Sequence, residues 1–149
     1  MPLDASYVGR SYPATPSYVV SREKIREFAD AIGAADVVYR DPAAARALGH
    51  PDVIAPPTFP IVLTAATLDQ LIDDPGLGLD FDRVVHGDQR FSYVRPVYAG
   101  DELTCVCTVA EISERAGAGF LTTRTEVRCG EDLVVTATAR LVVRAEATA

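Results

Sequence analysis

Apolar residues recur along the chain with two different periods, which divide it into an early helical part and a later part made of strands. Between residues 22 and 32, four apolar residues fall on one face of a helix: Ile25, Phe28, Ala29 and Ile32. Ser21 is a suitable N-cap, and Gly33 ends the helix by allowing a left-handed backbone. The pattern predicts a helix over residues 22–32, preceded by a short strand at residues 18–20.

Two further helices are predicted before the middle of the chain. Asp41 and Pro42 are typical of a helix start, and Gly49 would stop that helix at residue 48. After the sequence APPTFP at residues 55–60, an apolar helix is predicted over residues 61–72. Because this helix is apolar on most sides near its start, we expect a sheet to wrap around it.

The chain after residue 82 contains four long segments rich in Val and Thr. Strands are expected at residues 84–94, 102–112, 119–129 and 133–145, with short Gly-containing turns between them. Helices followed by such an antiparallel meander indicate the α+β class. We expect one domain over residues 1–149, with residues 1–17 lying extended over it.

Composition narrows the range of functions. The 149 residues are 48% apolar, which is enough for one globular core, and they carry a formal net charge of −7. This charge argues against a nucleic-acid partner, since phosphates are bound by clusters of Lys and Arg. Neither a membrane-spanning apolar run nor a signal peptide is recognisable, so we expect a cytoplasmic protein.

The three cysteines are expected to be free thiols. Cys105 and Cys107 lie two residues apart on a predicted strand, so they face the same side and are too close along the chain for an ordinary disulfide. Free buried thiols are typical of a reducing compartment. With two histidines and no Cys-x-x-Cys pair, we expect no metal site, and no cofactor is expected.

Two stretches of the chain resemble a known family. Residues 28–59 read FADAIGAADVVYRDPAAARALGHPDVIAPPTF, and residues 91–101 read FSYVRPVYAGD. Together they resemble the MaoC-like hot-dog dehydratases and hydratases, and in particular the actinobacterial non-catalytic subunits of heterodimeric (3R)-hydroxyacyl-carrier-protein dehydratases. The resemblance covers nearly the whole chain. It implies a single hot-dog domain, in which a curved antiparallel sheet wraps around a central helix, and a dimer with a continuous sheet.

The same resemblance implies that the catalytic groups of the family are missing here. The family has an Asp and a His in the connector after the first helix, where this chain has Ala34 and Tyr39. Tyr39 puts a phenol, which is a poor general base at neutral pH, in place of an imidazole. The family also uses a backbone N–H at the start of the central helix, whereas Pro57 has no N–H. A register shifted by two residues would make Asp36 the carboxylate.

His86 and Asp88 offer an alternative acid–base pair. Because residues two apart on a strand face the same side, their imidazole and carboxylate would project together, with Gly87 allowing a close approach. The other interpretation is a structural His that forms a hydrogen bond at an interface or to a nearby loop. His50, in the loop after Gly49, is expected to be exposed to solvent.

Arg90 and Arg95 are candidates for a local basic patch near the site entrance that would attract an acidic carrier protein. Alternatively, both are ordinary arginines of a strand surface.

The candidates for substrate binding surround the start of the predicted central helix: Tyr39, Ala55, Thr58, Phe59, Val62 and Ala65. Thr58 either caps this helix with its hydroxyl or contacts the substrate. Tyr39 either bonds to a thioester or fills the space of the missing His. Ala65 and Ala66 either leave a groove for an acyl chain or let the helix pack closely on the sheet.

The sequence therefore predicts the acyl-chain-binding subunit of a (3R)-hydroxyacyl-thioester dehydratase, a lyase of fatty-acid or polyketide biosynthesis. A MaoC-like partner would supply the catalytic Asp and His, and the acyl group would be carried by an acyl carrier protein or coenzyme A. The chain alone is expected to be inactive. The alternatives are a self-sufficient dehydratase or hydratase that uses His86 and Asp88, a non-catalytic acyl-thioester-binding homodimer and, with less support, a hot-dog thioesterase.

Overall fold

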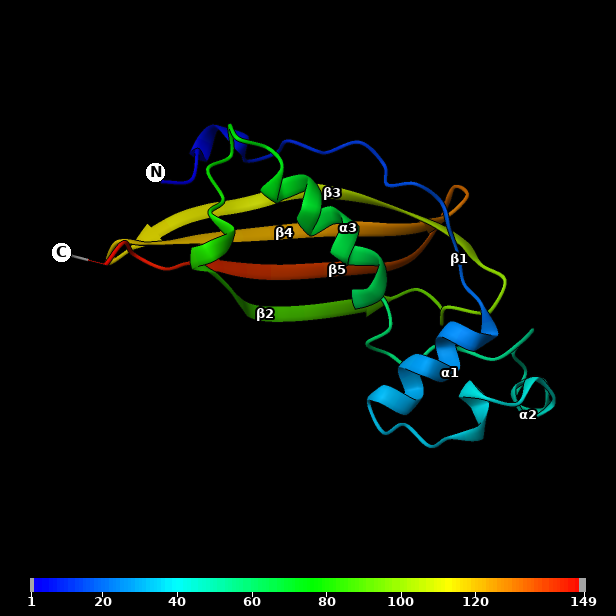
Figure 1. Cartoon of the computed structure of the whole chain (residues 1–149). Coiled ribbons are helices and arrows are strands. Elements are labelled where there is room, and N and C mark those ends of the chain that lie inside the picture. Colours follow the sequence, from blue (N-terminus) through cyan, green and yellow to red (C-terminus); the bar gives the residue numbers. More distant parts are fainter. Residues whose placement is uncertain (1, 148–149) are drawn as a thin grey trace.

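The computed structural model of the chain describes residues 2–147 (Figure 1). Its five strands form one antiparallel sheet in the order β1-β3-β4-β5-β2. The elements are η1 (Ala5–Tyr7), β1 (Tyr18–Val19), α1 (Arg22–Ala31), η2 (Val37–Tyr39), α2 (Pro42–Ala47), α3 (Ile61–Ile72), η3 (Phe81–Arg83), β2 (Val84–Tyr93), β3 (Glu102–Arg115), β4 (Ala118–Cys129) and β5 (Asp132–Val143).

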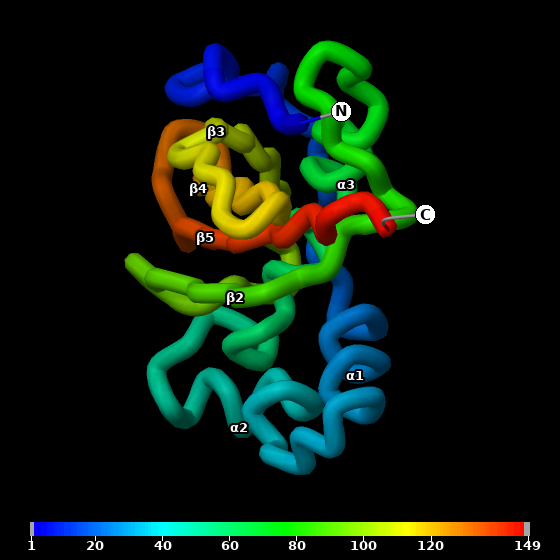
Figure 2. The backbone as a smooth tube through the Cα atoms, turned by 90° about the vertical axis from the view of Figure 1, so that its left-hand side faces the viewer, coloured from blue at the N-terminus to red at the C-terminus, as the bar shows by residue number. Residues whose placement is uncertain are grey.

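The helix α3 lies along one face of the curved sheet, while α1 and α2 lie together beyond the end of the sheet that is far from both chain ends (Figures 1 and 2). This arrangement confirms the expected α+β class and the curved sheet around a central helix. The expected single domain over residues 1–149 includes residues 1, 148 and 149, which lie outside the described residues.

The helix boundaries follow local capping signals. The Ser21 hydroxyl accepts a hydrogen bond from the Lys24 N–H at 3.0 Å, and the Asp41 carboxylate accepts one from the Ala43 N–H at 2.9 Å. Each such cap contributes about 1 kcal/mol to helix stability. The first two helices are one residue shorter than predicted, whereas α3 spans residues 61–72 as predicted.

The strands β3, β4 and β5 pair as a meander, as predicted. β3 is three residues longer than expected and continues to Arg115, because the following turn is only Ala116 and Gly117, both with positive φ. Such a two-residue turn matches the right-handed twist of the two strands it joins. β5 ends at Val143, two residues earlier than predicted.

The N-terminal segment, described from residue 2, covers the edge of the sheet formed by β3. The N–H groups of Gly9, Tyr12 and Thr15 donate to carbonyl oxygens of β3 over distances of 2.8–2.9 Å. The Thr15 hydroxyl in turn accepts from the Cys105 N–H at 3.0 Å. The segment runs beside β3 in Figure 1, so this edge of the sheet is closed by the chain itself.

A polar cluster fastens this segment to the end of α3. The Tyr7 and Tyr12 hydroxyls donate to the two oxygens of the Asp74 carboxylate at 3.1 and 2.9 Å. The Arg10 guanidinium lies 3.8 Å from the centre of the Tyr7 ring. Two hydrogen bonds to a charged acceptor are stronger than neutral ones, so this cluster fixes the segment against the domain.

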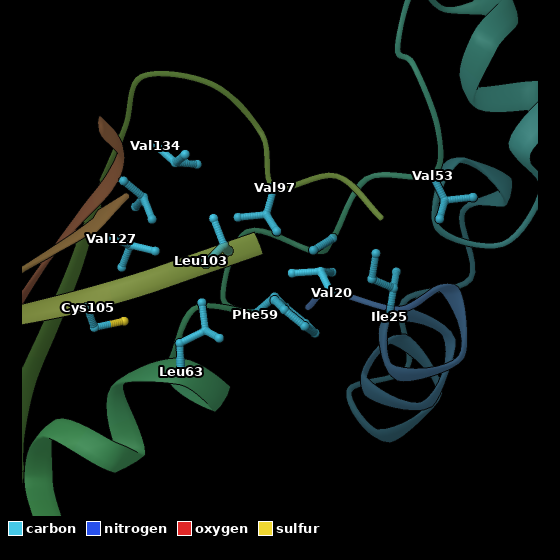
Figure 3. Close-up of a cluster of buried hydrophobic side chains, with 12 residues drawn as sticks. Val20, Ile25, Val53, Phe59, Leu63, Val97, Leu103, Cys105, Val127 and Val134 are labelled. Atoms are coloured by element: carbon cyan, nitrogen blue, oxygen red, sulfur yellow. The ribbon is translucent and has the colours of Figure 1, made fainter. Parts of the chain in front are cut away.

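Two hydrophobic clusters form the core. The first joins the start of α3 to α1 and to the strands; Phe59 lies between Ile25 of α1 on one side and Leu63 and Leu103 on the other (Figure 3). The Phe59 ring packs edge to face on the ring of Phe28, with centroids 5.5 Å apart. Burying a side chain of this size contributes about 1.5–3 kcal/mol.

The second cluster lies near the C-terminal end of α3 and includes Leu71, Leu77, Leu121 and Leu141. Cys105 and Cys107 belong to the first and second clusters respectively, and both are buried free thiols, as predicted. Burial raises the pKa of Cys105 to about 11, so this thiol stays protonated.

Candidate functional site

The side of α3 that faces β2 is not covered by the sheet. The helix buries a single stripe, consisting of Leu63, Thr67 and Leu71. Ile61 remains 38% exposed, and Ala65 is also exposed. The sheet packs against the buried stripe of this helix, as the sequence predicted. This flank of the helix remains open beside β2, the last strand of the sheet.

A groove of about 260 Å³ lies between this flank of α3 and the concave face of the sheet. The helix contributes six residues: Ile61, Thr64, Ala65, Thr67, Leu68 and Leu71. The strands contribute His86 and Gln89 of β2, Thr123 and Thr125 of β4, and Ala137, Ala139 and Leu141 of β5. We call this the α3–β2 groove.

The α3–β2 groove exists because small residues meet across it. Ala65 on the helix faces Ala137 and Ala139 on β5, where larger side chains would fill the space. Leu71 and Leu141 line the groove and also belong to the second core cluster, so the groove ends against that cluster. Of the two interpretations of Ala65, the structure therefore favours the groove over close packing on the sheet.

The start of α3 carries no side-chain cap. Pro60 occupies the N-cap position without a side-chain hydrogen bond, so the prediction that the Thr58 hydroxyl caps the helix is wrong. The Tyr93 hydroxyl donates to the Pro57 carbonyl at 2.7 Å, and burial raises the pKa of Tyr93. Within residues 2–147, the Thr58 N–H, which directly follows Pro57 in the chain, has no hydrogen-bond partner.

The connector after α1 contains no acid–base pair. The Ala34 carbonyl accepts a hydrogen bond from Arg40 at 2.6 Å. Asp36, the carboxylate of the shifted register, caps η2 by accepting from the Val38 N–H at 3.0 Å. Tyr39 is half-buried and packs against the first core cluster. The chemistry that the resemblance assigns to this connector is therefore missing from its side chains.

Among the substrate-binding candidates, only Ala65 lines the α3–β2 groove. Ala55 and Phe59 are buried in the first core cluster, and Val62 packs against it. Thr58 is exposed at the start of α3. Of the predicted substrate-binding residues, one therefore lines the groove, and most of the others pack in or against the core near the start of α3.

His86 and Asp88 do not project together. A β-bulge at Gly87 shifts the register, so that His86 pairs with Leu141 but Asp88 pairs with the next residue, Arg140. Neighbouring residues of β5 point to opposite faces of the sheet, and Leu141 is buried while Arg140 is exposed. The prediction that both face the same side is therefore wrong.

The bulge instead brings Gln89 to the concave face. Gln89 pairs with Ala139 and lines the α3–β2 groove together with His86. A Cβ atom at position 87 would lie 3.2 Å from a Val142 methyl group and 3.4 Å from the Arg140 carbonyl, so the bulge favours Gly there. A glycine inside a strand is the signal that could have revealed this shift from the sequence.

Arg95, Arg90 and His50 all lie outside the α3–β2 groove. The Arg95 guanidinium forms a two-pronged ion pair with Asp101 at 2.8 and 3.1 Å, so it holds the turn before β3 together. Arg90 is exposed on the convex face of the sheet, away from the α3–β2 groove. His50 is half-buried against the Tyr98 ring, with centroids 5.9 Å apart, which corrects the expectation that it is exposed.

Within residues 2–147 no three His, Cys, Asp or Glu side chains are arranged to hold a metal ion. No helix among these residues is long and apolar enough to span a membrane.

Comparison with known proteins agrees with this geometry. A family model described as "FAS1-like, dehydratase domain region" matches residues 6–137. A UPF0336 protein of Streptomyces coelicolor is 58% identical over 147 residues, which covers 97% of each chain.

Two solved structures are similar over most of this chain. The HadBC (3R-hydroxyacyl-ACP dehydratase) complex from Mycobacterium tuberculosis contains a chain with a TM-score of 0.81 and 31% identity, covering 91% of this chain and 96% of that one. A MaoC-like dehydratase has a TM-score of 0.82 and 28% identity, covering 94% of this chain and 43% of that one.

The fold and the groove define a hot-dog domain of the dehydratase type. The chain belongs to the FAS1-like dehydratase family, whose solved relatives are MaoC-like hot-dog proteins.

Proposed function

We propose that this chain is the acyl-chain-binding subunit of a (3R)-hydroxyacyl-thioester dehydratase of fatty-acid or polyketide biosynthesis. One observation carries the proposal. The α3–β2 groove is retained, while the connector that would hold the acid and base carries Ala34 and Tyr39. A chain of this kind binds the acyl group and leaves the proton transfers to a MaoC-like partner.

The proposed contact with the partner uses the bare edge of β2 and the uncovered flank of α3. β2 is ten residues long and, within the part of the chain that the structure describes, pairs with no strand but β5. A long exposed strand edge is a template for pairing with another chain. An interface of about 1,600 Å² is typical of a stable pair. Similarity to HadBC, which is a complex, supports a partner of the same fold.

The self-sufficient alternative is less compatible with the geometry. General acid–base catalysis needs both groups within reach of the same substrate atoms, but the bulge at Gly87 turns Asp88 away from His86. The His86 Nε2 atom lies 3.1 Å from the backbone carbonyl oxygen of Asp88, not from its carboxylate.

The decisive experiment is reconstitution. The chain alone should turn over neither crotonyl nor (3R)-hydroxyacyl thioesters above background, because general acid–base groups typically contribute about 10²–10⁴-fold each. Mixing it with a MaoC-like protein encoded beside it should give activity that disappears when the partner's Asp and His are replaced. Robust turnover by the chain alone that is abolished by His86→Ala would establish the self-sufficient enzyme instead. Thioester binding by a homodimer without any turnover would support the non-catalytic alternative.

A further inference from the structure

The bulge at Gly87 gives the α3–β2 groove a polar wall on β2. His86 and Gln89 are three residues apart, yet both line the groove because the bulge inserts one extra residue between them. Opposite them, the helix side of the groove is apolar at Ala65 and Leu68. An acyl chain in this groove would have hydrocarbon on one side and two polar side chains on the other.

The hydrogen bonds that His86 and Gln89 already make determine which of their atoms remain available to a ligand. The His86 Nε2 atom lies 3.1 Å from the Asp88 carbonyl oxygen, which only accepts, so Nε2 carries the proton. In the neutral imidazole Nδ1 is then an acceptor. The Gln89 side-chain NH₂ donates to the Thr138 carbonyl at 3.3 Å and to the Arg90 carbonyl at 3.5 Å, which leaves its Oε1 atom as an acceptor.

Within residues 2–147, neither His86 Nδ1 nor Gln89 Oε1 has a hydrogen-bond partner. The Thr64 and Thr67 hydroxyls donate their protons to helix carbonyls, and Thr123 and Thr125 interact with the Cys107 thiol. The protons of Thr64 and Thr67 are therefore already used within the protein. On the β2 wall, His86 Nδ1 and Gln89 Oε1 are two acceptors that no group of the described residues occupies. A hydroxyl group can donate to such atoms, whereas a ketone cannot.

The position of this wall is remote from the start of the helix. The Tyr93 hydroxyl contacts the Pro57 carbonyl just before α3, and Gln89 lies four residues along the same strand. At about 3.3 Å per residue, the backbone of Gln89 lies roughly 13 Å along β2 from that of Tyr93. A group bound by Gln89 would thus belong to the distal part of an acyl chain whose thioester lies near the helix start.

We propose that His86 and Gln89 recognise a hydroxyl group on the distal part of the acyl chain. This inference rests on the proposed function, since it takes the α3–β2 groove as the acyl site. The substrate class is then a hydroxylated acyl thioester, and Gln89 is a specificity-determining residue that the sequence did not reveal.

The test is a binding measurement with three N-acetylcysteamine thioesters of equal chain length: a plain dodecanoyl chain, one with a hydroxyl near its end and one with a ketone at the same carbon. Calorimetry with the full chain should show the hydroxylated chain binding about fivefold more tightly than the ketone, as expected for one net hydrogen bond. Gln89→Leu and His86→Leu should abolish this preference and favour the plain chain. Asp88→Asn, on the opposite face, is the matched control and should keep it.

Equal affinity for the hydroxyl and ketone chains, or an unchanged preference in Gln89→Leu, would overturn the inference. So would the absence of binding by all three thioesters, both alone and with the MaoC-like partner. Circular dichroism confirms that each variant is folded. Because the readout is a ratio of affinities rather than turnover, an inactive reconstituted pair would count against the proposed function without touching this result.

Discussion

The two edges of the sheet, at β3 and at β2, differ in whether the chain itself covers them. The β3 edge is closed by the chain's own N-terminal segment, which donates backbone hydrogen bonds to it and is fastened through Asp74. Among the described residues β2 pairs only with β5, and Ile61 and Ala65 on the neighbouring flank of α3 are exposed. A strand edge that is already paired does not invite pairing with another chain, so the open edge and its groove are the side that we propose for a partner and a ligand.

The largest effect is expected from placing a charge on the open edge. Val85 on β2 is 44% exposed, and Val85→Lys would put an ammonium group into the proposed contact. We expect this substitution to cost about 2 kcal/mol or more of binding free energy. The dissociation constant of the pair would then rise roughly thirtyfold or more. Light scattering and calorimetry with the MaoC-like partner, or with a second copy of the chain, measure it.

Val19→Lys is the matched control on the closed edge. Val19 lies on β1, is 63% exposed and pairs with Glu102, which tolerates a nearby Lys. Association should be unchanged in this variant. If both variants weaken association equally, or neither does, the two edges do not differ in the way described.

The next largest effect separates the two flanks of α3. Ala65→Phe would fill the α3–β2 groove, and each methylene it excludes is worth about 0.8 kcal/mol, or roughly fourfold in affinity. Two excluded methylenes would therefore weaken binding of the longest acyl chains roughly fifteenfold, with short chains retained. The chain-length profile of binding or of reconstituted turnover measures this shift.

Ala66→Phe is the control for the other flank. Ala66 is exposed but does not line the groove, and Gln70, one turn later on its side of the helix, donates to the Pro13 carbonyl of the N-terminal segment at 2.9 Å. The chain-length profile should stay as in the unmodified protein. An equal loss on all chain lengths in Ala65→Phe would mean that this alanine only packs.

The sequence predicts most of the fold because its signals are local. Ser21, Asp41 and the glycines that end α1 and α2 define those helices within one residue, since a cap depends only on the neighbouring backbone. Period-two patterns likewise define the strands. The resemblance located the start of α3 and the turn held by Arg95 and Asp101.

The site is less predictable because it depends on pairing between distant residues. One extra residue at Gly87 exchanges Asp88 for Gln89 on the concave face, and simple alternation along a strand does not include a bulge. The role of Arg95 depends on Asp101, six residues later, and its charge alone indicated a binding patch. The open flank of α3 depends on the order of the strands in the sheet, which ends at β2. No local sequence pattern encodes that order.

A smaller effect is expected at the closed edge. Asp74→Asn removes the charge that accepts hydrogen bonds from Tyr7 and Tyr12 but keeps one carbonyl acceptor. We expect the free energy of unfolding to fall by about 1 kcal/mol, which is roughly 3 °C in Tm for a domain of this size. Asp73→Asn, at an exposed position next in the chain, should leave Tm nearly unchanged.

The pH dependence of Tm tests whether the charge of the Asp74 carboxylate causes this stabilisation. Burial alone would raise the pKa of Asp74, but the Tyr12 and Tyr7 hydroxyls and the Gly76 N–H bond to the charged form and bring its pKa below the usual value. A lowered pKa in the folded state means that the stabilisation is present above the ordinary Asp pKa, near 3.9, and is lost as the pH falls through the lowered value. The Tm difference between the unmodified protein and Asp74→Asn should therefore be constant near neutral pH and shrink in acid, while the acid titration of other carboxylates affects both proteins alike. A difference that persists unchanged into strong acid would mean that the charge of Asp74 does not hold the N-terminal segment on the β3 edge.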